Sequence, residues 1–165
     1  MNIALEDILI RNTLRSGDMG YVIFLHGILY KKEYDYGIEF ESYVAAGLLE
    51  FYKNYDEQKD RVWICEHEKE IIGFLLLMHR PDNAAQLRYF LIKPEYRGLG
   101  LGKKLMKLYM NFFEKCNYTA SYLWTTHELS AAAALYTRYG FKLTEEIPTT
   151  NFGKPLKEQR YDLIL

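Results

Sequence analysis

One stretch of the chain, LRYFLIKPEYRGLGLGKKLMKLYMNFF at residues 87–113, limits the choice of fold more than any other. An apolar run leads into a turn with closely spaced glycines, and apolar residues then recur at helical spacing. The pattern predicts a strand, a glycine-rich turn and an amphipathic helix. Unpaired amides converge where such a turn opens a helix, and the helix dipole favours negative charge there. We therefore expect an anion site at residues 97–104.

Two common phosphate-binding motifs do not match these residues. A P-loop needs one more residue between its glycines than separates Gly98 from Gly102, and Lys104 stands where its hydroxyl should be. A dinucleotide-binding turn needs a third glycine at the position of Leu105. The spacing disfavours both sites, and a merely flexible turn at residues 98–102 stays open as an alternative.

The arginine and glycines at residues 97–102, RGLGLG, resemble the acetyl-CoA pyrophosphate loop of the GNAT superfamily of N-acetyltransferases. KPEY at residues 93–96 and LYTRYGF at residues 135–141 extend the resemblance in the order in which the family carries these motifs. Residues 17–34 and 123–136 are also similar to the acetyltransferase halves of proteins that begin with a MarR-type regulatory domain. No DNA-binding role is carried over from that likeness.

Patterns along the rest of the chain fit the fold that this resemblance implies. We expect one acetyltransferase domain over residues 1–165, with an α/β (mixed α+β) sheet of about seven strands flanked by about four helices. The fourth and fifth strands should be parallel, joined by a right-handed crossover, and splayed around CoA. The expected strands are residues 6–14, 61–66, 71–79, 87–92, 119–126, 141–145 and 159–165, the expected helices are residues 22–34, 40–51, 102–116 and 130–139, and residues 148–158 are expected to form a polar loop.

The resemblance also implies which residues bind acetyl-CoA, which is expected as the acyl donor without any metal. The pyrophosphate should lie on the loop amides, because side chains there would hold a diphosphate away from the backbone. The strand before the loop should contact pantetheine, and one of its N–H groups should polarise the thioester carbonyl. Lys103 and Lys104 fit a solvated lysine pair equally well. The cofactor-binding residues expected on this basis are Leu91, Ile92, Arg97, Gly98, Leu99, Gly100, Leu101, Gly102 and Lys103.

Tyr136 stands at the tyrosine position of the family, four residues before Gly140. The resemblance implies that its phenol protonates the departing CoA thiolate as a general acid. In a chain with 15 tyrosines, a residue that only packs beneath the loop is the alternative.

Two positions depart from the family pattern. Leu129 stands where many relatives carry an asparagine that contacts CoA. The strand at residues 86–92 lacks the glutamate that many relatives use as a base. His127, or Glu128 beside it, is therefore the candidate base, with a surface His–Glu pair and proton loss through water as alternatives.

An amine acceptor is expected between the first two helices, the loop at residues 148–158 and the strand ends. Aromatic and acidic groups suit a cationic amine, although each candidate also fits ordinary helix packing. The candidates are His26, Tyr30, Glu33 and Tyr34.

Composition excludes several other classes of function. The 21 basic and 22 acidic residues give a net charge of −1, without the basic excess typical of nucleic-acid binding. Cys65 and Cys116 lie within apolar patterns and are interpreted as buried, reduced thiols. The first residues do not resemble a signal peptide, and the longest apolar run, residues 71–78, is too short to span a membrane. We expect a soluble, cytoplasmic protein that binds neither nucleic acid nor membrane, and a homodimer stays open.

The expected function is acetyl-CoA-dependent N-acetylation of a primary amine, in a small molecule or a peptide, by direct attack on the thioester. A CoA-binding sensor or regulatory module without turnover is the alternative, because Leu129 and the strand without a carboxylate depart from the catalytic pattern. A different donor such as succinyl-CoA would need a cationic pocket that the sequence does not locate.

Overall fold

A mixed sheet of seven strands organises the computed structural model, which describes residues 2–165. The strands follow the order β1-β2-β3-β4-β5-β7-β6 across the sheet, and β4 and β5 form its parallel pair. This arrangement confirms the expected fold class. The strands are β1 (Leu9–Arg11), β2 (Arg61–His67), β3 (Glu70–Arg80), β4 (Ala84–Ile92), β5 (Ala120–Thr126), β6 (Lys142–Thr149) and β7 (Leu156–Ile164).

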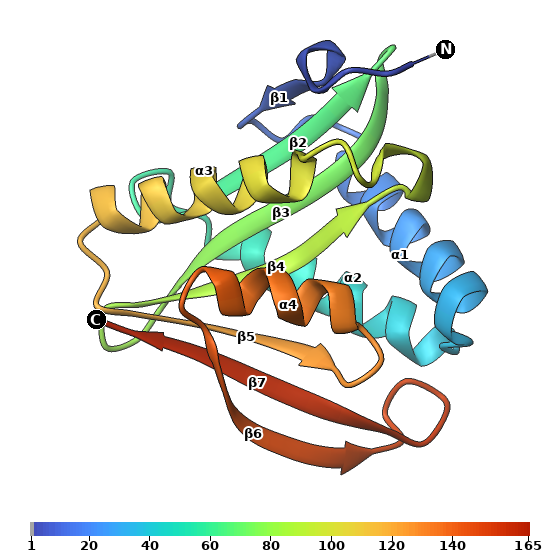
Figure 1. Cartoon of the computed structure of the whole chain (residues 1–165), viewed down its shortest axis with the longest axis vertical. Helices are drawn as coiled ribbons and strands as arrows, with labels where there is room; N and C mark the ends of the chain where they lie inside the picture. The colour runs from blue at the N-terminus through green and yellow to red at the C-terminus, as the bar shows by residue number, and fades with distance from the viewer. Residues whose placement is uncertain (1) are drawn as a thin grey trace.

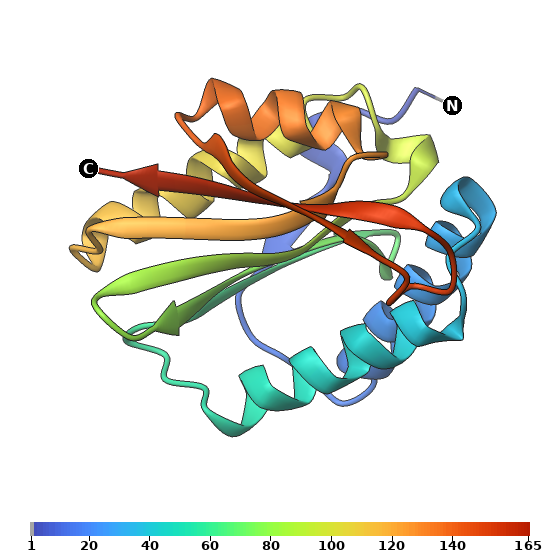
Figure 2. The ribbon, with the colours of Figure 1, turned by 90° about the horizontal axis from the view of Figure 1, so that it is seen from below.

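Two pairs of helices cover the two faces of this sheet (Figures 1 and 2). The α1–α2 pair packs on one face and the α3–α4 pair on the other, so the central strands are buried on both sides. Over residues 2–165 the α-helices are α1 (Asp18–Tyr34), α2 (Ile38–Lys53), α3 (Leu101–Lys115) and α4 (Ser130–Arg138), with short 3₁₀ turns at Leu5–Asp7 and Pro94–Tyr96.

The central strand β3 explains the uninterrupted apolar run at residues 71–78. Phe74 and Leu76 pack in the core beneath α1 and α2, whereas Leu75 and Leu77 pack in the core beneath α3 and α4. A strand covered on both faces has no polar side, so its sequence does not alternate. The prediction of a centrally buried strand is confirmed.

The parallel strands β4 and β5 pair only near their first residues. The paired positions run from Ala84 with Ala120 to Gln86 with Tyr122. Beyond Gln86, β4 continues to Ile92 without a partner on this side among residues 2–165. The two strands therefore diverge toward their carboxyl ends and leave a gap in the sheet, as expected.

A bulge in β4 accompanies this divergence. The register against β3 shifts between the pair Arg88–Leu76 and the pair Leu91–Phe74. Tyr89, inside the bulge, has a φ of 59°, which is uncommon for an aromatic residue. Bulges redirect side chains and are frequent beside functional sites. The sequence pattern does not predict this feature.

The structure corrects two predicted boundaries. Residues 5–7 form a 3₁₀ turn, so the predicted strand at residues 6–14 shortens to β1. The predicted loop at residues 148–158 is too long at both ends, because β6 extends to Thr149 and β7 begins at Leu156, so that only residues 150–155 form a loop. Pro148 is compatible with a strand here because β6 lies at the edge of the sheet.

The two cysteines differ in their surroundings. Cys65 is fully buried in the core, and this burial raises the pKa of its thiol to about 12. Cys116 is only partly buried, so the prediction of a buried thiol is wrong at that position. Both are free thiols. Within residues 2–165, the structure contains no helix with the length and apolar character that crossing a bilayer requires.

Candidate active site

The glycine-rich loop leaves a run of backbone amides free at the start of α3. Lys104 donates its amide to the Gly100 carbonyl at 3.1 Å, as the first bond of the helix. The amides of residues 98–103 have no hydrogen-bond acceptor within residues 2–165. Gly98 and Gly100 have φ values of 80° and 90°, a left-handed conformation that residues with a side chain rarely adopt. These amides at a helix N-terminus fit a diphosphate.

Arg97 begins the loop and is held by two other contacts. Its guanidinium makes a bidentate ion pair with Glu33 at 2.8 and 2.9 Å, and its Nε donates to the Ile92 carbonyl at 2.9 Å. The hydrogen bonds to Glu33 raise the pKa of Arg97. The Arg97 amide donates to the Pro94 carbonyl at 3.2 Å, so it is already used within the protein. The run of free amides therefore begins at Gly98.

A cleft of about 380 Å³ opens beside this loop. Its walls come from α1, the end of β4, the loop and the start of α4. Six of the nine predicted cofactor residues line it: Leu91, Ile92, Arg97, Gly98, Leu101 and Gly102. The other three lie outside the lining: Leu99 packs against the core, Gly100 caps α3, and Lys103 is exposed.

The end of β4 directs one predicted amide toward the gap between β4 and β5. Lys93 donates its amide to the Ile72 carbonyl, on the side of β3. Because successive backbone amides of a strand point to opposite edges, the Ile92 amide points to the gap and the Leu91 amide points to β3. Of the two, Ile92 has the amide that could polarise a carbonyl in the gap, and Leu91 contributes its side chain to the wall of the cleft.

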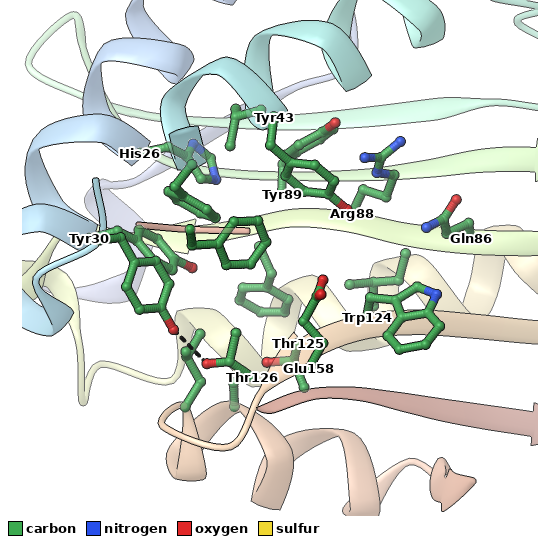
Figure 3. Close-up of a pocket in the computed structure, with 18 of the residues that line it drawn as sticks. His26, Tyr30, Tyr43, Gln86, Arg88, Tyr89, Trp124, Thr125, Thr126 and Glu158 are labelled. Carbon is green, nitrogen blue, oxygen red and sulfur yellow. Dashed lines mark hydrogen bonds between the residues drawn. The ribbon is translucent and has the colours of Figure 1, made fainter. Parts of the chain in front are cut away.

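A second pocket, of about 100 Å³, adjoins the cleft and is drawn in Figure 3. Tyr30, Phe90, Leu129 and Ala132 line both, so the two spaces share a wall. The pocket draws side chains from both helix pairs and from β4, β5 and β7, and therefore reaches through the gap in the sheet. Among the predicted acceptor-site residues, His26 and Tyr30 line this pocket, while Tyr30, Glu33 and Tyr34 line the cleft.

Tyr136 lies in the wall of this pocket, near the boundary with the cleft. Its side chain is 5% exposed and meets the Phe90 ring edge-on, with 6.2 Å between ring centroids. Burial raises the pKa of its phenol well above the usual value, so the proton stays in place at neutral pH. The hydroxyl makes no hydrogen bond to another group within the described chain, residues 2–165. The phenol is therefore a protonated donor without a fixed acceptor.

Two titratable side chains that line the pocket, Glu158 and His26, have atoms that make no hydrogen bond within residues 2–165. Glu158, on β7, has neither an ion pair nor a side-chain hydrogen bond with any residue from 2 to 165. His26 lies 2.8 Å from the Val22 carbonyl through Nδ1, which must carry the hydrogen, so Nε2 is an acceptor. Burial lowers the pKa of His26 to about 4, which keeps the ring neutral.

The structure does not bring His127 to either space. Its side chain is exposed, and Nδ1 accepts a hydrogen bond from the Lys157 amide at 3.0 Å. A role for His127 as the base stays a prediction. Glu128 beside it turns into the cleft, where one carboxylate oxygen pairs with Lys154 at 3.0 Å. The other oxygen is buried and has no partner within residues 2–165.

The sequence pattern does not single out two charged residues of the second pocket, Arg88 and Glu158. Glu158 is the last residue of the predicted loop, and Arg88 belongs to the predicted strand that lacks a carboxylate. Their signal is weak because each becomes a pocket residue only through the pairing of β7 with β5 or through the bulge in β4. Within residues 2–165, no group of three or more His, Cys, Asp or Glu side chains is arranged to hold a metal ion.

Comparison with known proteins agrees with this arrangement. The profile of the acetyltransferase (GNAT) family matches residues 28–141, from α1 to the end of the loop that follows α4. The uncharacterized N-acetyltransferase YjgM of Escherichia coli (strain K12) is 31% identical over 114 residues, which are 66% of this chain and 68% of YjgM.

Solved structures share the fold over nearly the whole chain. A GNAT-family acetyltransferase from Staphylococcus aureus Mu50 matches with a TM-score of 0.77 at 22% identity, over 96% of this chain and 99% of the other. The structure of yncA from Salmonella typhimurium, solved with its cofactor acetyl-CoA, matches with a TM-score of 0.69 at 18% identity, over 96% of this chain and 94% of yncA.

Proposed function

The chain belongs to the acetyltransferase (GNAT) family and is an N-acetyltransferase, and on this premise we propose that it acetylates a small primary amine with acetyl-CoA. We further propose that residues 1–165 act as one catalytic domain. The observation that carries the proposal is the contact between two spaces of different character. A cleft with free amides adjoins a pocket with aromatic, acidic and imidazole side chains.

Acetyl-CoA, when bound, would supply the acetyl group as a thioester that the amine attacks directly. The amides of residues 98–103 would hold the pyrophosphate, and the gap between β4 and β5 would hold the pantetheine arm. The Ile92 amide would donate to the carbonyl oxygen, which gains negative charge during the attack. These roles rest on the free amides and on the divergence of the strands.

Tyr136 would supply the proton that the sulfur of CoA takes as the carbon–sulfur bond breaks. The raised pKa of its phenol supports this role, because the group is protonated at neutral pH. Its place beside Phe90 and Ala132, which also line the cleft, supports it as well.

Glu158 would attract the ammonium form of the acceptor and accept the proton that the amine must lose. Its carboxylate lines the pocket and is not neutralised by an ion pair with any residue in the described part of the chain. Figure 3 shows it pointing from β7 into the pocket. His127 remains the sequence-based rival for the role of base, although it lies outside both spaces.

Release of CoA thiol tests the proposal. The purified protein is incubated with acetyl-CoA and a panel of small amines, polyamines, amino acids and peptides, with thiol release recorded over time. We expect at least one amine to raise thiol release well above the amine-free rate, with the N-acetylated product found by mass spectrometry. Binding of acetyl-CoA without transfer to any amine would instead favour the sensor, and no binding would contradict both.

A further inference from the structure

We propose, on the basis of the function proposed above, that the acceptor carries a carboxylate as well as its amine and that Arg88 binds this carboxylate. Arg88 lies on β4 and lines the acceptor pocket, and its side chain is 9% exposed. Small amino acids, including those whose amine lies several carbons from the carboxylate, are the class of acceptor that this residue would select.

The guanidinium of Arg88 is mostly buried against the rings of Tyr43 and Tyr89, 5.6 and 4.8 Å from their centroids, and it lacks a close anionic partner. It makes no hydrogen bond to any group in residues 2–165, although it carries five N–H donors. Its ion-pair contact is a long one, 3.7 Å from a Glu50 oxygen. The other Glu50 oxygen is bound by Arg80 at 2.6 Å, so Glu50 is already neutralised. The guanidinium therefore keeps N–H donors that an anionic ligand could pair with.

The bulge in β4 and a glycine in α2 create the space around Arg88. Successive residues of a regular strand point to opposite faces, but both Arg88 and Tyr89 reach the same face, toward Gly47 of α2. A Cβ at Gly47 would lie 2.6 Å from Arg88 Nη2 and would overlap with the Tyr89 hydroxyl. The Tyr89 hydroxyl is itself buried with no partner in residues 2–165. Two unpartnered donors therefore converge at this position.

The lining of the pocket also contains one positive side chain, Arg88, and one negative side chain, Glu158. Arg88 extends from β4 toward α2 on one side of the pocket, and Glu158 extends from β7 with its carboxylate directed toward β4 (Figure 3). An amine at Glu158 and a carboxylate at Arg88 would neutralise both side chains in one ligand. Guanidinium and carboxylate form two parallel hydrogen bonds, which gives orientation as well as affinity. The pocket volume of about 100 Å³ favours a small acceptor of this kind.

The test compares each carboxylated amine with a counterpart that lacks the negative charge. Initial rates are measured with acetyl-CoA for alanine against ethylamine and alaninamide, and for β-alanine and 4-aminobutyrate against ethylamine and propylamine. We expect the wild type to favour at least one carboxylated amine. In Arg88→Gln, kcat/KM for that amine should fall about 30-fold, while the counterpart changes less than about threefold.

Two variants control for a purely structural role of Arg88. Arg80→Gln removes the other arginine that contacts Glu50 but does not line the pocket, so it should leave the ratio of the two kcat/KM values unchanged. Arg88→Lys keeps the positive charge but lacks the planar guanidinium, and it should recover part of the wild-type preference for the carboxylated amine. Equal losses for both acceptors in Arg88→Gln, or no preference in the wild type, would overturn the inference.

The carboxylate could also belong to the acyl donor. Succinyl-CoA is therefore compared with acetyl-CoA at a fixed amine. The inference would be overturned if Arg88→Gln lost a preference for succinyl-CoA while the ratio of kcat/KM for the carboxylated amine to that for its counterpart stayed unchanged. If no amine is acetylated, the proposed function fails, and calorimetry on the complex with CoA decides this inference separately. Binding of a carboxylated amine that requires Arg88 would support it, and absence of such binding would contradict it.

Discussion

The cleft beside the glycine-rich loop and the second pocket, here called the donor cleft and the acceptor pocket, present different kinds of chemical group. The cleft lies against one contiguous segment, residues 98–103, whose backbone amides are free and of which Gly98, Leu101 and Gly102 line the cleft. The pocket offers side chains that come from α1, α2, β4, β5, α4 and β7. Amides cannot be substituted without changing the backbone, whereas pocket side chains can change one by one. Under the proposed function, the backbone amides would bind the donor, and the side chains of the pocket would determine which acceptor is used.

The largest effect is expected at Tyr136, which lies near the boundary between the cleft and the pocket. In Tyr136→Phe we expect kcat to fall about 1,000-fold, because the thiolate loses its proton donor. The KM values for acetyl-CoA and amine should stay within about threefold, since the ring still packs against Phe90. Steady-state kinetics with both substrates varied would check this.

Tyr139→Phe is the matched control for Tyr136. The Tyr139 hydroxyl donates to the Lys103 carbonyl at 3.1 Å and lines neither space, so its loss should change kcat only slightly. Unchanged turnover in Tyr136→Phe would leave that tyrosine as a packing residue beneath the loop.

The backbone character of the cleft is tested at Gly100. Gly100→Val forces a side chain into a conformation with a φ of 90°, and the rearranged loop should lose its convergent amides. We expect the Kd for CoA to rise about 100-fold, measured by calorimetry. Gly20→Ala, in α1 with open space around the position, should bind CoA normally. Normal binding by Gly100→Val would mean that the loop amides do not hold the diphosphate.

The difference between the two spaces also explains which of them could be predicted from the sequence. RGLGLG is contiguous, and its glycines are required locally by φ values of 80° and 90° at Gly98 and Gly100, so the pattern is visible without tertiary information. Tyr136 follows from a second contiguous motif. The order of strands and helices was predictable because the periodicity of apolar residues is also local.

The acceptor pocket could not be predicted in the same way, because tertiary pairing creates it. Arg88 reaches the pocket through a bulge that the apolar pattern of β4 does not encode. Glu158 becomes a pocket residue because β7 pairs with β5 and places it opposite Thr126. The edge position of β6, which allows Pro148 within a strand, likewise depends on the complete sheet. His26 and Tyr30 were found because they lie on one predicted helix.

The acceptor side is tested by comparing two candidate bases. In Glu158→Gln we expect kcat/KM for the amine to fall about 50-fold, because the pocket loses both attraction for the ammonium group and a proton acceptor. KM for acetyl-CoA should not change, since Glu158 does not line the cleft. His127→Gln is measured in parallel and should have near wild-type rates. A larger loss in His127→Gln than in Glu158→Gln would reverse the assignment.

The smallest effect concerns the stability of the pocket wall and rests on His26. Burial lowers the pKa of this histidine to about 4 in the folded chain, against about 6.5 in an unfolded one. Between these values the unfolded chain binds the extra proton, so the free energy of unfolding should fall as the pH drops from 7 to 5, by about 1–2 kcal/mol. In His26→Phe this contribution is absent, and the ring can keep its packing against Tyr30 and Tyr89.

Urea unfolding at pH 7 and pH 5 would measure the difference in the free energy of unfolding between the wild type and His26→Phe. Equal pH dependence in both would show that His26 takes up its proton without unfolding, and that the pocket admits a charged imidazole.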